Sequence, residues 1–92
     1  MKPFRWNHEK NERLKAERNI SFEEIVLAIE ADGLVDIVAH FNLGKYPRQR
    51  MFVVIVEQYA YLVPFVEEDD HYFLKTVIPN RKATRHYLKG GV

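Results

Sequence analysis

The chain has 92 residues, no cysteine, and 14 Lys and Arg against 13 Asp and Glu, which gives a net charge of +1. This length predicts a single domain, residues 1–92, and the lack of cysteine excludes disulfides, thiolate zinc sites and a cysteine nucleophile. The sequence has neither a signal-peptide pattern nor an apolar stretch near the roughly 20 residues that a membrane-spanning helix needs, so we expect a cytoplasmic protein that makes no membrane contact.

Two helices are predicted in the first third of the chain. After a short extended start at Phe4–Trp6, Asn7 is a candidate N-cap for a polar helix over His8–Arg18. Ser21 and Glu24 have the spacing of a capping box, which predicts that a second, amphipathic helix begins directly after Ser21.

Four strands are predicted next, over residues 34–39, 50–56, 59–66 and 72–78. Successive strands of this kind favour an antiparallel meander with the helices on one of its faces. The strand 50–56 is apolar on both faces and should be central and covered on both sides. Pro64 has no backbone donor, so it should place the strand 59–66 at an edge or a bulge.

A long loop and a last helix complete the predicted elements. The polar loop 40–49 is longer than a hairpin requires, which is typical of functional loops, and it carries His40, Lys45 and Arg48. Asn80 is a candidate N-cap for a helix with an apolar side that includes Tyr87. Its other side is basic and carries Arg81, Lys82, Arg85, His86 and Lys89.

Positive charge is concentrated in the second half of the chain. Residues 45–92 contain 8 basic and 5 acidic residues, and no carboxylate side chain follows Asp70. A cluster of Arg50, Lys75, Arg81 and Arg85 would form if the last strand lies beside the central one. Guanidinium groups suit phosphate contacts, so a phosphate backbone is the predicted ligand. The alternative is that these cations only keep an exposed helix soluble.

Histidines supply the remaining candidate chemistry. His40 ends a strand and begins the long loop, and His86 lies on the basic side of the last helix; either suits a general acid or base, or a plain solvent-facing role. The four histidines lack metal-site spacing, and the acidic run at residues 67–70 is typical of a solvated turn. We therefore expect no metal and no cofactor.

Four blocks of the sequence resemble the BrnT family of toxins. They are Phe4-x-Trp6-Asn7-x-x-Lys10-Asn11, Asn19-Ile-Ser-Phe-Glu-Glu24, Arg50 before the central strand, and Ile78-x-x-Arg81-Lys82-Ala83-Thr84. The resemblance implies an α+β fold of the RelE/ParE-like group, with two N-terminal helices, a four-stranded antiparallel sheet and a C-terminal helix. It also implies a ribonuclease toxin of a type II toxin–antitoxin system, whose antitoxin, of the ribbon-helix-helix type, alone contacts operator DNA. Ile78-Pro79-Asn80 departs from the family's Ile-Ser-Ala step, which would redirect the entry to the last helix.

The hypothesis that follows is metal-independent RNA cleavage, in which the substrate's own 2′-hydroxyl attacks the adjacent phosphate. Arg81 and Arg85 would stabilise charge, Lys75 or His40 would act as base, and His86 or Tyr87 would protonate the leaving group. RNA-binding roles are assigned to Arg50, Lys82, Lys45 and Arg48. The alternative is a non-catalytic module whose basic surface binds RNA or a partner protein.

Overall fold

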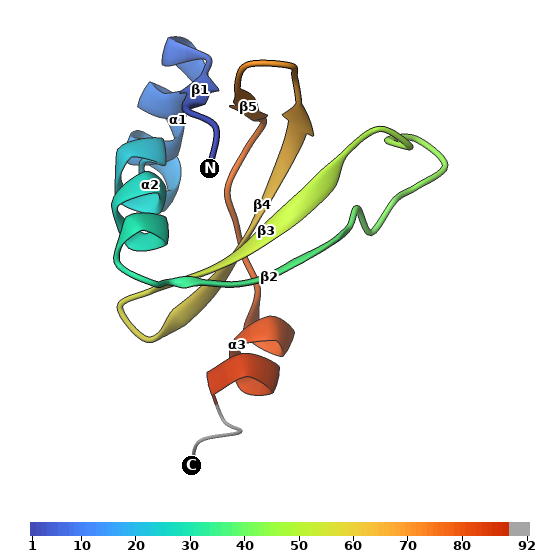
Figure 1. Ribbon diagram of the computed structural model, residues 1–92. Helices are drawn as coiled ribbons and strands as arrows, with labels where there is room; N and C mark the ends of the chain where they lie inside the picture. Colours follow the sequence, from blue (N-terminus) through green and yellow to red (C-terminus); the bar gives the residue numbers. More distant parts are fainter. Residues whose placement is uncertain (89–92) are drawn as a thin grey trace.

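The structure, a computed structural model, describes residues 1–88 and arranges their helices and strands as shown in Figure 1. The helices are α1 (His8–Arg18), α2 (Phe22–Glu30) and α3 (Arg81–Leu88). The strands are β1 (Phe4–Trp6), β2 (Leu34–Ala39), β3 (Arg50–Val56), β4 (Tyr59–Glu67), β5 (Tyr72–Leu74) and β6 (Ile78–Pro79).

The caps of the first two helices form as the sequence predicts. Asn7 accepts a hydrogen bond from the Lys10 N–H at the start of α1. The capping box at the start of α2 is complete, because the Ser21 side chain accepts from the Glu24 N–H and the Glu24 carboxylate accepts from the Ser21 N–H. Both predicted helix starts are confirmed.

Asn11 joins the two helices from a buried position. Its side chain is 1% exposed, its amide donates to Glu23 Oε1 at 2.7 Å, and its carbonyl accepts from the Phe22 N–H at 2.8 Å. The Phe22 N–H is one of the donors that a helix start leaves unpaired, so Asn11 satisfies a group that would otherwise be costly to bury.

The sheet has six strands, not the predicted four. Its order is β1-β5-β4-β3-β2, with β6 also paired to β4. The extended start at Phe4–Trp6 joins the sheet by pairing in parallel with β5, and the predicted strand 72–78 divides into β5 and β6. The coarse prediction of helices packed on a largely antiparallel sheet with a central 50–56 strand is confirmed.

Pro64 explains the division of the predicted strand. The sequence predicts that its strand lies at an edge or carries a bulge. The edge is wrong, because β4 lies between β3 and β5, but the ladder beside Pro64 is interrupted between Leu74 and Ile78. The Pro64 carbonyl accepts from the Lys75 N–H at 2.8 Å, and the nitrogen and carbonyl of one strand residue point to the same neighbouring strand. The donor that proline lacks is therefore missing on the β5–β6 side, where the ladder stops at residues 75–77.

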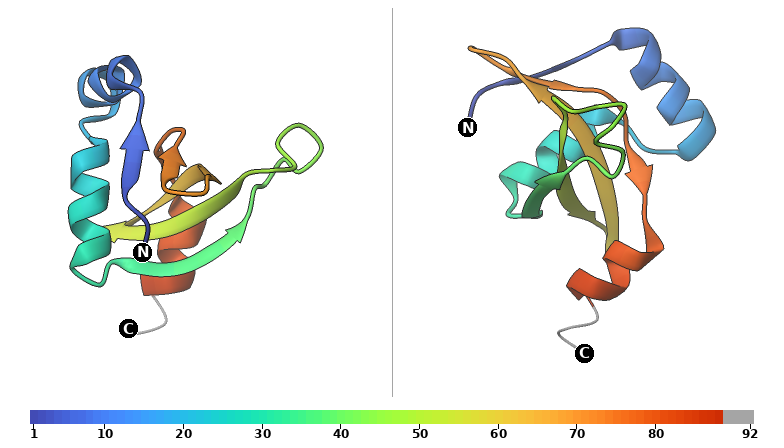
Figure 2. Two further views of the ribbon diagram at one scale, coloured as in Figure 1. Left: turned by 45° about the horizontal axis from the view of Figure 1, so that its top comes forward. Right: turned by 90° about the vertical axis from the view of Figure 1, so that its right-hand side faces the viewer.

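The two faces of the sheet carry separate apolar clusters, so β3 is covered on both sides as predicted. On the face that we term the first face, α1 and α2 pack over a cluster that includes Phe22, Phe52 and Phe65. On the opposite, second face, α3 places Ala83 and Tyr87 against a smaller cluster. The prediction that all helices cover one face is wrong for α3, which lies well away from α2 in Figure 2. No helix within residues 1–88 has the length and apolar character needed to cross a bilayer.

Candidate functional site

A hollow of about 330 Å³ lies on the second face, next to the part that α3 covers. The 40–49 loop forms one side, and the segment that links β5 to β6 forms another. The residues that line it are His40, Phe41, Tyr46, Gln49, Pro64, Lys75, Thr76 and Ile78. Two residues that the sequence nominated for catalysis, His40 and Lys75, therefore meet here, and the lining contains no carboxylate.

The interruption after β5 gives the hollow its shape. The chain leaves β4 after Lys75 and pairs with it again at β6. Val77, in between, is buried, and its carbonyl accepts a hydrogen bond from the Arg18 guanidinium of α1, which holds this segment in place. Phe73 pairs with Val66, and the Lys75 N–H bonds Pro64, so Phe73 and Lys75 both lie on the second face by strand alternation.

His40 is held rigidly at the root of the loop. Its side chain is 5% exposed and its ring lies 4.5 Å from that of Phe41 and 4.7 Å from that of Tyr46, between centroids. Its Nδ1 accepts from the Asn42 N–H at 2.9 Å, so the neutral ring carries its proton on Nε2.

The side chain of His40 is part of the lining of the hollow. No hydrogen bond within residues 1–88 engages the Nε2 of His40. Because no fully buried side-chain nitrogen or oxygen in that range lacks a hydrogen-bond partner, Nε2 must be at least partly accessible. Neutral His40 is thus a hydrogen-bond donor to whatever enters the hollow. In this tautomer Nδ1 accepts from the Asn42 N–H and Nε2 carries the proton, so the ring offers a donor to the hollow. The role of His40 as a base stays a prediction.

Lys75 supplies the positive charge of the hollow. Its side chain is exposed, its Nζ lies 5.2 Å from the centroid of the Phe73 ring, and no ion pair within residues 1–88 engages it. A cation without a carboxylate partner and an N–H donor facing the same space suit a phosphate group.

Two further predicted residues, Lys45 and Arg48, adjoin this hollow. They line a shallower depression of about 290 Å³ together with Tyr46 and Gln49, which belong to both. Lys45 Nζ lies 5.3 Å from the centroid of the Tyr46 ring. The predicted basic loop is therefore continuous with the His40–Lys75 hollow. Sequence reasoning missed Gln49 and Thr76, since no local pattern marks a polar residue that lines a hollow formed by distant segments.

Arg50 lies on the other side of the sheet, so the expected single cluster does not form. Its guanidinium carbon is 5.2 Å from the centroid of the Phe65 ring, which belongs to the first-face core. It pairs with Glu67, and Glu67 also pairs with Lys2. The hydrogen bond from Lys2, together with both cations, lowers the pKa of Glu67 below its ordinary value. Arg50 is thus paired with Glu67 and lies outside the His40–Lys75 hollow.

Replacing Arg50 by alanine is expected to leave RNA binding unchanged and to lower the free energy of unfolding only slightly, because an ion pair between exposed side chains contributes little to stability. Urea denaturation and titration with a labelled RNA measure the two quantities. A clear loss of RNA affinity in a folded Arg50→Ala protein would contradict the placement of Arg50 outside the site.

The cations of α3 form a second basic group at the far end of the second face. The Asn80 N–H donates to the Ala60 carbonyl, and the Ala60 N–H donates to Thr84 Oγ1, which fixes α3 beside the start of β4. Ala60 and Pro64 are four residues apart, or about 13 Å along a strand. Residues at this end are the exposed Arg81, Lys82, Arg85 and His86, and none of them lines the His40–Lys75 hollow.

Tyr87 connects α3 to β2. Its hydroxyl donates to Asp36 Oδ2 at 2.6 Å. This hydrogen bond lowers the pKa of Asp36 and raises the pKa of Tyr87 relative to their ordinary values. The Tyr87 hydroxyl proton is therefore engaged in attaching α3 to β2. The role of Tyr87 as an acid for the leaving group stays a prediction.

The Asp36–Tyr87 bond should make this attachment of α3 pH-dependent in two windows. Because the pKa of Asp36 is lowered, its contribution is present above about pH 4 and is lost as pH falls through the folded-state value. Because the pKa of Tyr87 is raised, its contribution is lost as pH rises through a value above 10.0. In Asp36→Asn, NMR titration should show Tyr87 ionising at lower pH than in the wild type; an unchanged midpoint would contradict the bond.

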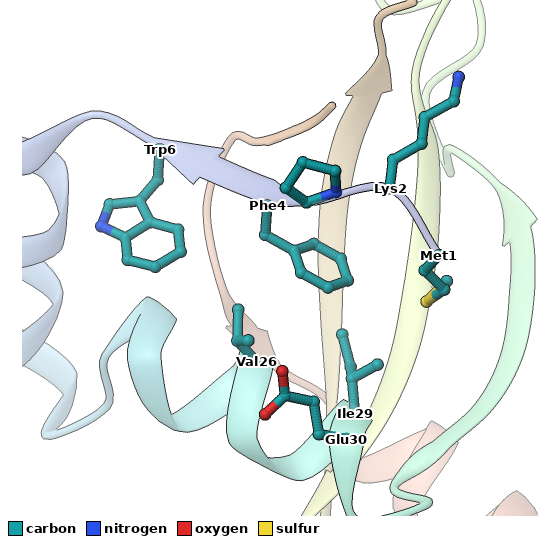
Figure 3. Close-up of a pocket in the computed structure, with 8 residues that line it drawn as sticks. Met1, Lys2, Phe4, Trp6, Val26, Ile29 and Glu30 are labelled. Carbon is teal, nitrogen blue, oxygen red and sulfur yellow. The ribbon is translucent and has the colours of Figure 1, made fainter. Parts of the chain in front are cut away.

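A hollow of about 480 Å³ on the first face is a weaker candidate. Figure 3 shows Phe4, Trp6, Val26 and Ile29 around it, between the N-terminal strand and α2. The charged residues of its lining are Lys2 and Glu30, and Lys2 is already paired with Glu67. A mostly apolar lining without converging donors offers no basis for phosphate chemistry.

Three comparisons bear on the identity of the chain. No family model, no curated protein and no solved structure matches it. The BrnT resemblance therefore stays a prediction. Within residues 1–88, no three His, Asp or Glu side chains gather as metal ligands.

Proposed function

We propose that this protein binds RNA on the second face of its sheet and cleaves it without a metal ion. The observation that carries the proposal is the meeting of His40 and Lys75 in one hollow that has no carboxylate in its lining and that adjoins Lys45 and Arg48. An N–H donor and an unpaired cation in the lining of one hollow suit a phosphodiester better than a neutral or cationic ligand.

The chemistry follows from what this hollow offers. The RNA 2′-oxygen forms a bond to the adjacent phosphorus, and the bond from phosphorus to the 5′-oxygen breaks, which leaves a 2′,3′-cyclic phosphate and a 5′-hydroxyl. Lys75 and the Nε2–H of His40 stabilise the negative charge that develops on the phosphate oxygens. Water takes the proton of the 2′-hydroxyl and supplies one to the leaving oxygen.

The resemblance extends this proposal to a biological role. We propose that the protein is the toxin of a type II toxin–antitoxin system, with a RelE/ParE-like fold and a cytoplasmic location. Its partner would be a ribbon-helix-helix antitoxin. The toxin would associate with operator DNA only through this antitoxin. The separate basic group on α3, Arg81, Lys82, Arg85 and His86, would then contact a more distant part of the RNA or the antitoxin.

An experiment with purified protein tests the cleavage. A labelled single-stranded RNA should be cut to products that end in a 2′,3′-cyclic phosphate, and the rate should not change with EDTA. The same sequence as DNA should stay intact, because it lacks the internal nucleophile. Intact RNA after long incubation with the folded protein, or cleavage that EDTA abolishes, would refute metal-independent cleavage.

A second candidate function is RNA binding without cleavage. It is favoured by one specific observation: the lining of the hollow contains no carboxylate, and Nδ1 of His40 already accepts a hydrogen bond, which leaves Lys75 as the remaining nominated base. Steep weakening of RNA binding with salt, together with intact RNA, would establish this alternative. Induced expression that stops bacterial growth and depletes mRNA would exclude it.

A further inference from the structure

We propose, as an extension that depends on the proposed function, that the substrate is a single-stranded RNA that continues from the His40–Lys75 hollow to α1. There Lys10 and Arg13 bind the phosphate of a flanking nucleotide. The proposal adds a binding subsite on a helix that sequence analysis did not connect with phosphate.

The geometric basis is a chain of three adjoining hollows. Lys10 and Arg13 line a hollow of about 560 Å³ with Asn7, Glu9, Phe73 and Lys75. Lys75 also lines the His40 hollow. Tyr46 and Gln49, in turn, link the His40 hollow to the depression beside Lys45 and Arg48. Figures 1 and 2 show α1 and the 40–49 loop on opposite sides of β5. The shared lining residues Lys75, Tyr46 and Gln49 connect the three hollows between these two segments, and we term the connected hollows the path.

Basic side chains outnumber carboxylates in the lining of the three hollows. Five cations line the three hollows, Lys10, Arg13, Lys45, Arg48 and Lys75, against the two carboxylates Glu9 and Glu68. None of the five takes part in an ion pair within residues 1–88, whereas Lys2, Lys15 and Arg50 do. Cations that no carboxylate neutralises, aligned along a path, suit a phosphate backbone.

Two aromatic rings on the path favour a single strand over a duplex. Phe73 lies in the α1 hollow and Tyr46 in the loop hollows, each with a lysine amino group above it at 5.2 Å or 5.3 Å from the centroid. Rings of this kind stack on unpaired bases, which a base-paired helix does not present. The arrangement of cations and rings therefore selects RNA with exposed bases.

The test uses 2′-O-methyl RNA, which cannot be cleaved because its nucleophile is blocked. A trinucleotide, which offers only two phosphodiesters to the central hollow, is compared with an oligonucleotide of about eight residues, within the usual range for such sites. Lys10→Ala and Arg13→Ala should each weaken binding of the longer RNA about fivefold at 0.1 M salt. Each should also reduce the slope of log Kd against log salt by roughly 0.7.

Lys15→Ala is the matched control, because Lys15 lies on the same helix but pairs with Glu12. It should leave binding of both RNAs unchanged, and none of the three variants should affect the trinucleotide. If Lys10→Ala and Arg13→Ala behave like Lys15→Ala while the wild type binds and cuts RNA, the α1 subsite is refuted and the proposed function stands. A wild type that binds neither oligonucleotide refutes both. If Lys10→Ala and Arg13→Ala bind poly-glutamate more weakly than the wild type but bind RNA equally well, the path would serve an acidic protein partner and the inference would be overturned.

Discussion

Replacing Lys75 by alanine is expected to slow RNA cleavage by about 100- to 1,000-fold, the usual cost of removing one group that stabilises transition-state charge. Lys75 is the sole lysine or arginine in the lining of the His40 hollow, so no neighbour there replaces it. Initial rates at saturating concentrations of a labelled RNA measure the effect. Far-ultraviolet circular dichroism confirms that the variant is folded.

Two further variants sharpen this prediction. Lys75→Arg should retain part of the rate, because a guanidinium keeps the charge but not the position of the amino group. Arg81→Ala tests the family-based assignment directly, since Arg81 lies outside the hollow. Loss of cleavage in Arg81→Ala with an unaffected Lys75→Ala would place the chemistry on α3 and contradict the present site.

Replacing Phe52 by alanine is expected to lower the free energy of unfolding by about 3–5 kcal/mol. Phe52 is 0% exposed and stacks on Phe65, with ring centroids 3.8 Å apart and ring planes at 7°. The rings of Phe4 and Tyr72 contact it edge-on. Domains of this size are stable by only about 5–15 kcal/mol, so the variant should be marginally folded.

Urea denaturation followed by fluorescence or circular dichroism measures this loss. Leu27→Ala is the control, because Leu27 is a large apolar residue that is 64% exposed on α2. It should change the free energy of unfolding by no more than about 0.5 kcal/mol. Equal effects of the two substitutions would show that the aromatic cluster does not hold the sheet together.

The sequence allowed the helices and the central strand to be predicted because their signals are local. The capping box at Ser21 and the apolar run after Arg50 each act within a few residues. The parallel pairing of β1 with β5 joins Phe4 to Tyr72, and no local pattern encodes a contact at that separation. Likewise, the sequence shows that Pro64 has no backbone N–H. Which neighbouring strand loses a hydrogen bond as a result depends on the register of the strands, which the sequence does not reveal.

The candidate site was predicted in part. His40, Lys45, Arg48 and Lys75 were nominated from their chemistry, and the structure brings them together. Arg50 was misplaced for a physical reason: β3 is apolar on both faces, so alternation along the strand does not reveal which face carries the loop. Assigning a face requires knowing on which side each helix packs.

The position of Asp36 has a consequence for solubility. β2 forms one of the two outer edges of the sheet, and its Val35 and Ile37 are 44% and 42% exposed. Asp36 separates them, and its Oδ1 accepts the Ile37 N–H, which makes that donor less available to another chain. Unprotected edges of apolar strands template aggregation. Asp36 is thus a gatekeeper, and its loss would favour intermolecular strand pairing and insoluble protein during overexpression.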